Sequence, residues 1–139
     1  YKKGFGNNAV NEVTYNTLLQ KADLISFHVP LTVETQGWVN HEFVKSLQRP
    51  IVIMNTARGP IVDLEALQYG LEAGKVLGAC LDVLPEEPPI KWQTHDSFRQ
   101  LLSDNRVVFS PHIAGWSTAS HKLLSTCLAE KILIYYGIS

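Results

Sequence analysis

The chain has 139 residues, of which 45% are hydrophobic and 18% are charged, and this composition is typical of one compact globular domain. Its formal net charge of −1, without a run of like charges, argues against a nucleic-acid partner and against an anionic membrane as partner. Its longest apolar stretches have the length of a strand, far short of the roughly 20 residues that span a bilayer, so no membrane segment is expected.

Helical and strand patterns alternate along the chain. Apolar residues at helical spacing behind a capping residue predict helices, and short apolar runs rich in β-branched residues predict strands. In chain order the pattern predicts a helix over 14–21, a strand over 24–29, a helix over 41–48, a strand over 51–55, a helix over 64–73, a strand over 76–83, a helix over 96–102, a strand over 107–110, and a long amphipathic helix from Ser117 or Thr118 to near Tyr136. Strands separated by helices predict an α/β fold with a parallel sheet.

Each predicted strand runs into polar or reactive residues at its carboxyl end. The strand over 51–55 continues into Thr56, Ala57 and Arg58. An arginine there is badly placed for a core but well placed to bind an anionic substrate, because open α/β sheets bind ligands at that end. The segments that follow the other strands add carboxylates, a histidine and a glycine-containing turn. These groups can orient a carboxylate substrate and transfer a proton.

Four ordered segments together resemble one known family. They are residues 28–32, 55–63, 81–88 and 111–116. In this order the chain resembles, over nearly its whole length, the C-terminal part of the NAD-binding domain of a D-isomer-specific 2-hydroxyacid dehydrogenase. The Gly115-Trp116 pair is most similar to the phosphoglycerate dehydrogenase-type members. The resemblance implies an oxidoreductase that transfers a hydride between NAD(H) and a D-2-hydroxy acid/2-keto acid pair, with 3-phosphoglycerate as one candidate.

The resemblance also implies three catalytic residues. Arg58 would bind the substrate carboxylate and polarise the keto oxygen, since its planar guanidinium suits bidentate anion binding. His112 would donate a proton to that oxygen in reduction and accept it in oxidation, a role that suits an imidazole. Glu87, rather than the adjacent Glu86, would be the carboxylate that orients the imidazole and favours its charged form.

The cofactor implied by the resemblance is NAD, held by residues at the strand ends. Asp82 would meet the nicotinamide carboxamide, and Gly115 would let the backbone approach the cofactor closely. The remaining cofactor-binding residues are Val29, Pro30 and Thr35 beneath the cofactor, and Thr56 and Ala57 on the side of the nicotinamide ribose.

The residues alone leave alternatives open. Arg58 could instead form an ion pair with Asp63 or Glu65, Glu86 could take the place of Glu87, and Asp82 could be a plain turn residue. A non-catalytic NAD-sensing or corepressor-like interaction protein on the same fold could also keep these residues. The sequence therefore favours an enzyme without excluding this second class.

The sequence contains no GxGxxG motif, which the first turn of a dinucleotide-binding fold requires. We therefore expect a fragment, in which residues 1–116 are the C-terminal portion of a Rossmann domain and residues 117–139 are a helix that packs toward a substrate domain. On a strand order of 3-2-1-4-5-6 the chain would supply strands 3–6. The strand over 24–29 would then lose its neighbours and pair elsewhere, either directly with 51–55 or with a second copy.

The remaining expectations concern thiols, metals and environment. Cys80 and Cys127 form no CxxC motif, so we expect buried free thiols in a reducing compartment. No group of potential ligands has the spacing of a zinc site, so no bound metal is expected. A cytoplasmic homodimer is the expected state.

Overall fold

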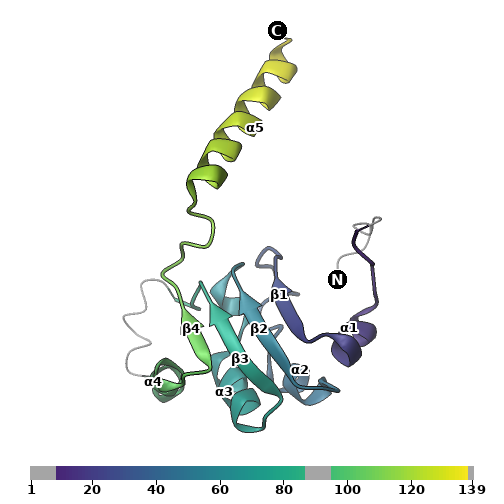
Figure 1. The fold of residues 1–139 in the computed structure, drawn as a ribbon, viewed down its shortest axis with the longest axis vertical. Helices are drawn as coiled ribbons and strands as arrows, with labels where there is room; N and C mark the ends of the chain where they lie inside the picture. The colour runs from purple at the N-terminus through teal and green to yellow at the C-terminus, as the bar shows by residue number, and fades with distance from the viewer. Residues whose placement is uncertain (1–8, 87–94, 138–139) are drawn as a thin grey trace.

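The computed structural model describes residues 9–86 and 95–137, and helices alternate with strands throughout (Figure 1). The elements are α1 (Tyr15–Lys21), β1 (Leu24–Phe27), α2 (His41–Ser46), β2 (Ile51–Asn55), the 3-10 helix η1 (Gly59–Ile61), α3 (Leu64–Glu72), β3 (Val76–Leu81), α4 (Asp96–Ser103), β4 (Val107–Phe109) and α5 (Thr118–Tyr136). Every predicted helix and strand is present in the predicted order. The short helix η1 is the addition, and several strands end one or two residues before their predicted limit.

The strands form a four-stranded parallel sheet in the order β1-β2-β3-β4. This confirms the predicted α/β fold with a partial parallel sheet and flanking helices. Of the two pairings expected for the first strand, the structure has the direct one, because β1 pairs with β2 from Leu24 opposite Val52 to Phe27 opposite Asn55. Each connection moves the chain to the next position, so the strands follow one another as in one half of a doubly wound sheet.

The core lies between the sheet and the helices that cover it. In β2 the inward residues Ile51 and Ile53 are fully buried, and α3 contributes the fully buried Leu67. The helices begin where the capping pattern predicted. Asn40 accepts a hydrogen bond from the backbone N–H of Phe43, and the Asp63 carboxylate accepts two from the first turn of α3. These caps fix the turns from which the helices pack onto the sheet.

Helix α5 stands away from the sheet, as the yellow-green helix in Figure 1 shows, and none of its residues is buried. Ser117 and Ser120 form a capping box at its start, and Gly137 ends it in the left-handed conformation with φ of 64°. Its apolar residues are spread around the helix, so the predicted amphipathic pattern is wrong. None of the helices in the described residues is long and apolar enough to span a membrane.

The two cysteines are free, but neither is buried. Cys80 on β3 is half-buried and Cys127 on α5 is exposed. The expectation of buried thiols is therefore wrong, and for Cys127 the reason is that α5 does not pack on the sheet.

Candidate active site

The carboxyl ends of the four strands lie level with one another. Phe27, Asn55, Leu81 and Phe109 are paired across the sheet, each opposite the next. All four strands end at this row, so the residues that follow them emerge at one edge. The structure thus brings the segments after the strands together, as the sequence predicted.

The turn that carries Arg58 is fixed by a buried amide. The side chain of Asn55 is fully buried, accepts a hydrogen bond from the N–H of Ala57 at 3.1 Å and donates one to the carbonyl oxygen of Arg58 at 2.9 Å. Arg58 itself is exposed, and its guanidinium donates to the Ala57 carbonyl oxygen at 2.6 Å. Asn55 thereby fixes the backbone from which Arg58 extends.

The alternative structural role for Arg58 does not occur. Asp63 and Glu65 are both described, and neither forms an ion pair with Arg58. The Asp63 carboxylate instead caps α3 through the N–H groups of Glu65 and Ala66. Sequence reasoning gave no role to the Asn55 side chain, although an amide at the end of an apolar strand is a signal for one.

The turn after Arg58 lies directly against the segment after β3. A Cβ atom added to Gly59 would lie 1.8 Å from the carbonyl oxygen of Leu84 and 2.4 Å from the nitrogen of Pro85. Only glycine allows this approach. Glu87 follows shortly after Pro85 but lies outside the described residues, so its catalytic role stays a prediction.

Asp82 is buried, with 5% of its surface exposed, and its carboxylate binds the segment after β4. Its Oδ1 accepts hydrogen bonds from the Ser110 hydroxyl at 2.5 Å and from the N–H of Ile113 at 2.9 Å, and its Oδ2 accepts one from the N–H of Ala114 at 2.9 Å. Burial alone would raise the pKa of Asp82. The hydrogen bonds and the nearby His112 outweigh it, so the pKa lies below its ordinary value.

His112 stands at the exposed tip of this segment in a rare conformation. Its φ of 54° makes it the one non-glycine residue in the described part of the chain with a positive φ. Its N–H donates to the main-chain carbonyl oxygens of Asp82 at 2.8 Å and Ser110 at 3.0 Å. The histidine is thus fixed to the ends of both β3 and β4.

The residues predicted to bind the cofactor lie along the same edge and differ in their exposure and in the hydrogen bonds they already form. Val29 and Thr56 are half-buried, and Ala57 is buried. Thr35 is occupied within its own loop, because its hydroxyl donates to the carbonyl oxygen of Pro30 at 2.7 Å.

No other part of the chain crowds Gly115. A Cβ there would meet nothing within 4 Å, so the chain's own packing does not require the glycine. Open space beside Gly115, an apolar surface at Val29 and a hydroxyl at Thr56 fit the nicotinamide end of NAD in chemical kind.

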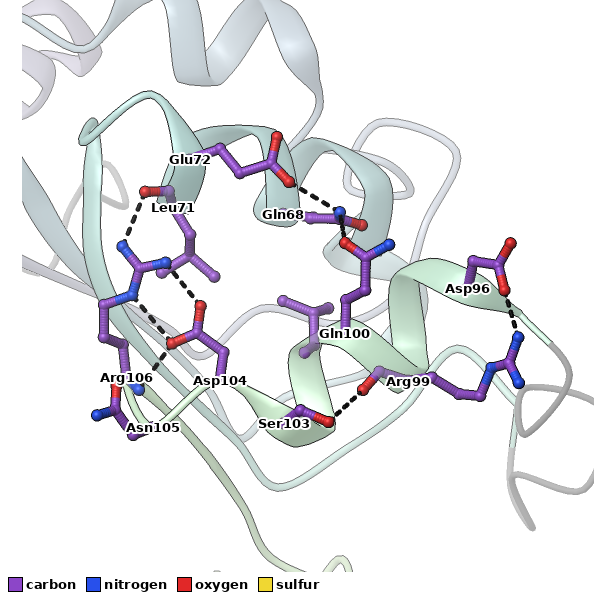
Figure 2. Close-up of a pocket in the computed structure, with 11 residues that line it drawn as sticks. Gln68, Leu71, Glu72, Asp96, Arg99, Gln100, Ser103, Asp104, Asn105 and Arg106 are labelled. Carbon is purple, nitrogen blue, oxygen red and sulfur yellow. Dashed lines mark hydrogen bonds and ion pairs between the residues drawn. The ribbon is translucent and has the colours of Figure 1, made fainter.

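A separate groove of about 920 Å³ lies between α3 and α4 (Figure 2). The polar side chains that line it are bonded mainly to one another. Arg106 binds both carboxylate oxygens of Asp104 and the carbonyl oxygen of Leu71, and the pair with Arg106 lowers the pKa of Asp104 to about 2. Arg99 pairs with Asp96. The groove lies at the amino end of β4, whereas His112 follows the carboxyl end of that strand. The remaining charged group of the groove, Glu72, accepts a hydrogen bond from Gln68 (Figure 2).

Comparisons with known proteins agree with the geometry. The sequence model of the family described as "D-isomer specific 2-hydroxyacid dehydrogenase, NAD binding domain" matches residues 2–114. The chain is 40% identical over 129 residues to a hydroxypyruvate reductase of Thermotoga maritima, covering 93% of this chain and 41% of that protein. It is 34% identical over 124 residues to a D-3-phosphoglycerate dehydrogenase of Bacillus subtilis, covering 89% of this chain and 22% of that protein.

A solved structure shows the same architecture. The crystal structure of D-lactate dehydrogenase with NAD+ from Lactobacillus jensenii superposes with a TM-score of 0.73 at 26% identity, over 91% of this chain and 41% of that one. The chain therefore spans less than half the length of each of these three proteins.

Proposed function

The chain belongs to the D-isomer specific 2-hydroxyacid dehydrogenase family, in its NAD-binding domain, and from this membership we propose that the protein is an NAD-dependent oxidoreductase. Its reaction is hydride transfer between NAD(H) and a D-2-hydroxy acid/2-keto acid pair. The observation that carries the proposal is the common edge of the sheet, where the turns of Arg58 and His112 follow β2 and β4 on either side of Asp82.

The proposed substrate is a small anionic 2-keto acid or the matching 2-hydroxy acid, and the names of the relatives supply the candidates. Hydroxypyruvate and 3-phosphoglycerate are named for the two curated relatives and lactate for the solved structure. Each is a carboxylate with an oxygen on the neighbouring carbon. A guanidinium in a fixed turn, such as Arg58, suits recognition of that carboxylate.

NAD, when bound, supplies or accepts the hydride in this proposal. Val29, Pro30 and Thr35 would lie under the cofactor and Thr56 and Ala57 beside its nicotinamide ribose. Asp82 keeps acceptor capacity for the carboxamide, since a carboxylate has about four lone-pair positions and three donors occupy it here. Gly115 would leave room for the cofactor.

The acid–base chemistry is assigned to His112, with Glu87 as its carboxylate partner. In reduction, Arg58 binds the carboxylate and draws electron density toward the keto oxygen. His112 then gives a proton to that oxygen as the carbon gains the hydride, and in oxidation it takes the proton back. The exposure of both Arg58 and His112 at the surface supports this role.

The proposal extends to the surroundings of the domain. Helix α5 carries exposed apolar residues on all sides, such as Leu124 with 68% and Ile134 with 81% of their surfaces exposed. An apolar helix of this kind is stable when other elements cover it, and we assign that role to a substrate domain. A cytoplasmic homodimer completes the proposal, and the free cysteines are compatible with a reducing compartment.

A panel of 2-keto acids tests the proposal. NADH absorbance is followed with the full-length protein and, in turn, hydroxypyruvate, 3-phosphohydroxypyruvate, glyoxylate and pyruvate. Turnover with at least one of these keto acids is expected. NADH binding without turnover on any member would place the protein in the NAD-sensing class instead.

A further inference from the structure

The segment that carries His112 is held by one buried carboxylate. Three donors from three residues reach Asp82: the Ser110 hydroxyl and the N–H groups of Ile113 and Ala114. These donors lie on both sides of His112 in the sequence. The Asp82 side chain therefore closes a loop around His112 that starts at the end of β4 and ends before α5.

The backbone of this loop is strained at His112, and neighbouring contacts must hold it in that conformation. The φ of 54° at His112 lies in the left-handed region, which is unfavourable for an L-residue because its Cβ crowds the backbone. Such a conformation persists only where neighbouring contacts determine it. The contacts here are the hydrogen bonds from the N–H of His112 to the Asp82 and Ser110 carbonyl oxygens, and the three bonds to the Asp82 carboxylate.

Ser110 is the member of this network that can be changed without disturbing the core. Its residue surface is exposed, whereas Asp82 is buried. The Ser110 hydroxyl shares Oδ1 of Asp82 with the N–H of Ile113, at 2.5 and 2.9 Å. It therefore restrains the rotation of the carboxylate that would break the bonds to Ile113 and Ala114.

We propose that Ser110 is a positioning residue for His112: its hydroxyl orients the Asp82 carboxylate, and the carboxylate in turn holds the 110–114 loop with His112 in the left-handed conformation. The inference that this arrangement aids proton transfer rests on the proposed function. The inference that Ser110 maintains the loop conformation is independent of that function, because it follows from contacts within the chain.

The test compares Ser110→Ala with Ser110→Thr in the full-length protein. Alanine removes the hydroxyl, and threonine keeps it in a similar position. Ser103→Ala is the matched control, because Ser103 is also exposed and its hydroxyl donates to a carbonyl oxygen, that of Arg99, away from the site. Amide hydrogen exchange of Ile113 and Ala114 and the backbone NMR shifts of His112 are measured without substrate, and kcat and KM are measured separately.

The expected result for Ser110→Ala is exchange at Ile113 and Ala114 that is about tenfold faster, as for loss of one hydrogen bond of average strength. The His112 shifts move away from those of a left-handed residue, and kcat falls more than KM changes. Ser110→Thr and Ser103→Ala retain wild-type exchange and shifts. Unchanged exchange and shifts in Ser110→Ala overturn the proposal, and so does the same change in Ser110→Thr.

The two sets of measurements separate this proposal from the proposed function. Absence of turnover in the wild-type protein would overturn the function, while exchange and shifts would still decide whether Ser110 positions His112. A wild-type enzyme whose kcat is unaffected by Ser110→Ala, despite a loosened loop, would overturn the positioning role alone.

Discussion

The main-chain N–H of Asp82 donates to the carbonyl oxygen of Asn55 across β2 and β3, at an N···O distance of 3.0 Å. Both residues are buried and polar, and each uses its side chain to hold a turn outside the sheet. Asn55 holds the turn of Arg58, and Asp82 holds the loop of His112. The proposed substrate-binding group and the proposed proton donor are therefore fixed to a shared pair of strands.

The first prediction concerns the buried amide. Asn55→Ala leaves the N–H of Ala57 and the carbonyl oxygen of Arg58 without their side-chain partner. Loss of buried hydrogen bonds should lower the free energy of unfolding by about 1–3 kcal/mol. Asn105→Ala, at an exposed position, should change it by less than about 0.5 kcal/mol. Urea unfolding measures both, and equal stabilities of the two variants would contradict the assigned role of Asn55.

The second prediction compares two glycines. Gly59→Ala puts a Cβ 1.8 Å from the Leu84 carbonyl oxygen, so the two segments must separate, and we expect a loss of about 3 kcal/mol. Gly115→Ala has open space around it and should leave the unfolding free energy within about 0.5 kcal/mol of wild type.

Cofactor affinity distinguishes these glycines further. If Gly115 lies beside NAD, Gly115→Ala weakens NADH binding in a fluorescence titration although the fold is intact. Wild-type affinity in this variant would remove Gly115 from the cofactor site. A stable, fully active Gly59→Ala variant would contradict the close approach of the two segments.

The alternation of helices and strands could be read from the sequence because apolar spacing and capping residues such as Asn40 and Asp63 act locally. The shared edge of the sheet followed from the polar residues after each strand. The sequence left two pairings open for β1, with β2 or with a second copy, because the choice depends on which neighbours a strand meets in space. The amphipathic pattern predicted for α5 was wrong, because its apolar residues are spread around the helix and not gathered on one face.

The site itself was predicted in part. Arg58, Asp82 and His112 stand at the edge where the sequence placed them. The partners of Asp82 were not predictable, because Ser110 and Ala114 approach it only when β4 lies beside β3. The left-handed φ of His112 is likewise a product of those contacts and has no signature in the sequence.

The third prediction is a pH dependence. The native pKa of Asp82 lies below its unfolded value, so its stabilising contribution is complete above about pH 4 and is lost as the pH falls through the native pKa. Asp82→Asn removes this contribution. Its deficit in unfolding free energy relative to wild type should be largest near neutrality and should shrink in acid. Denaturant unfolding over this pH range measures it, and a deficit that grows in acid would contradict the assignment.

The proton transfer assigned to His112 is tested with His112→Gln in the full-length protein, with NADH binding and 2-keto acid reduction measured side by side. Glutamine keeps hydrogen-bonding capacity but cannot act as the acid, so turnover should fall by about 100-fold or more while NADH affinity stays near wild type. Turnover at the wild-type rate in His112→Gln would contradict the account.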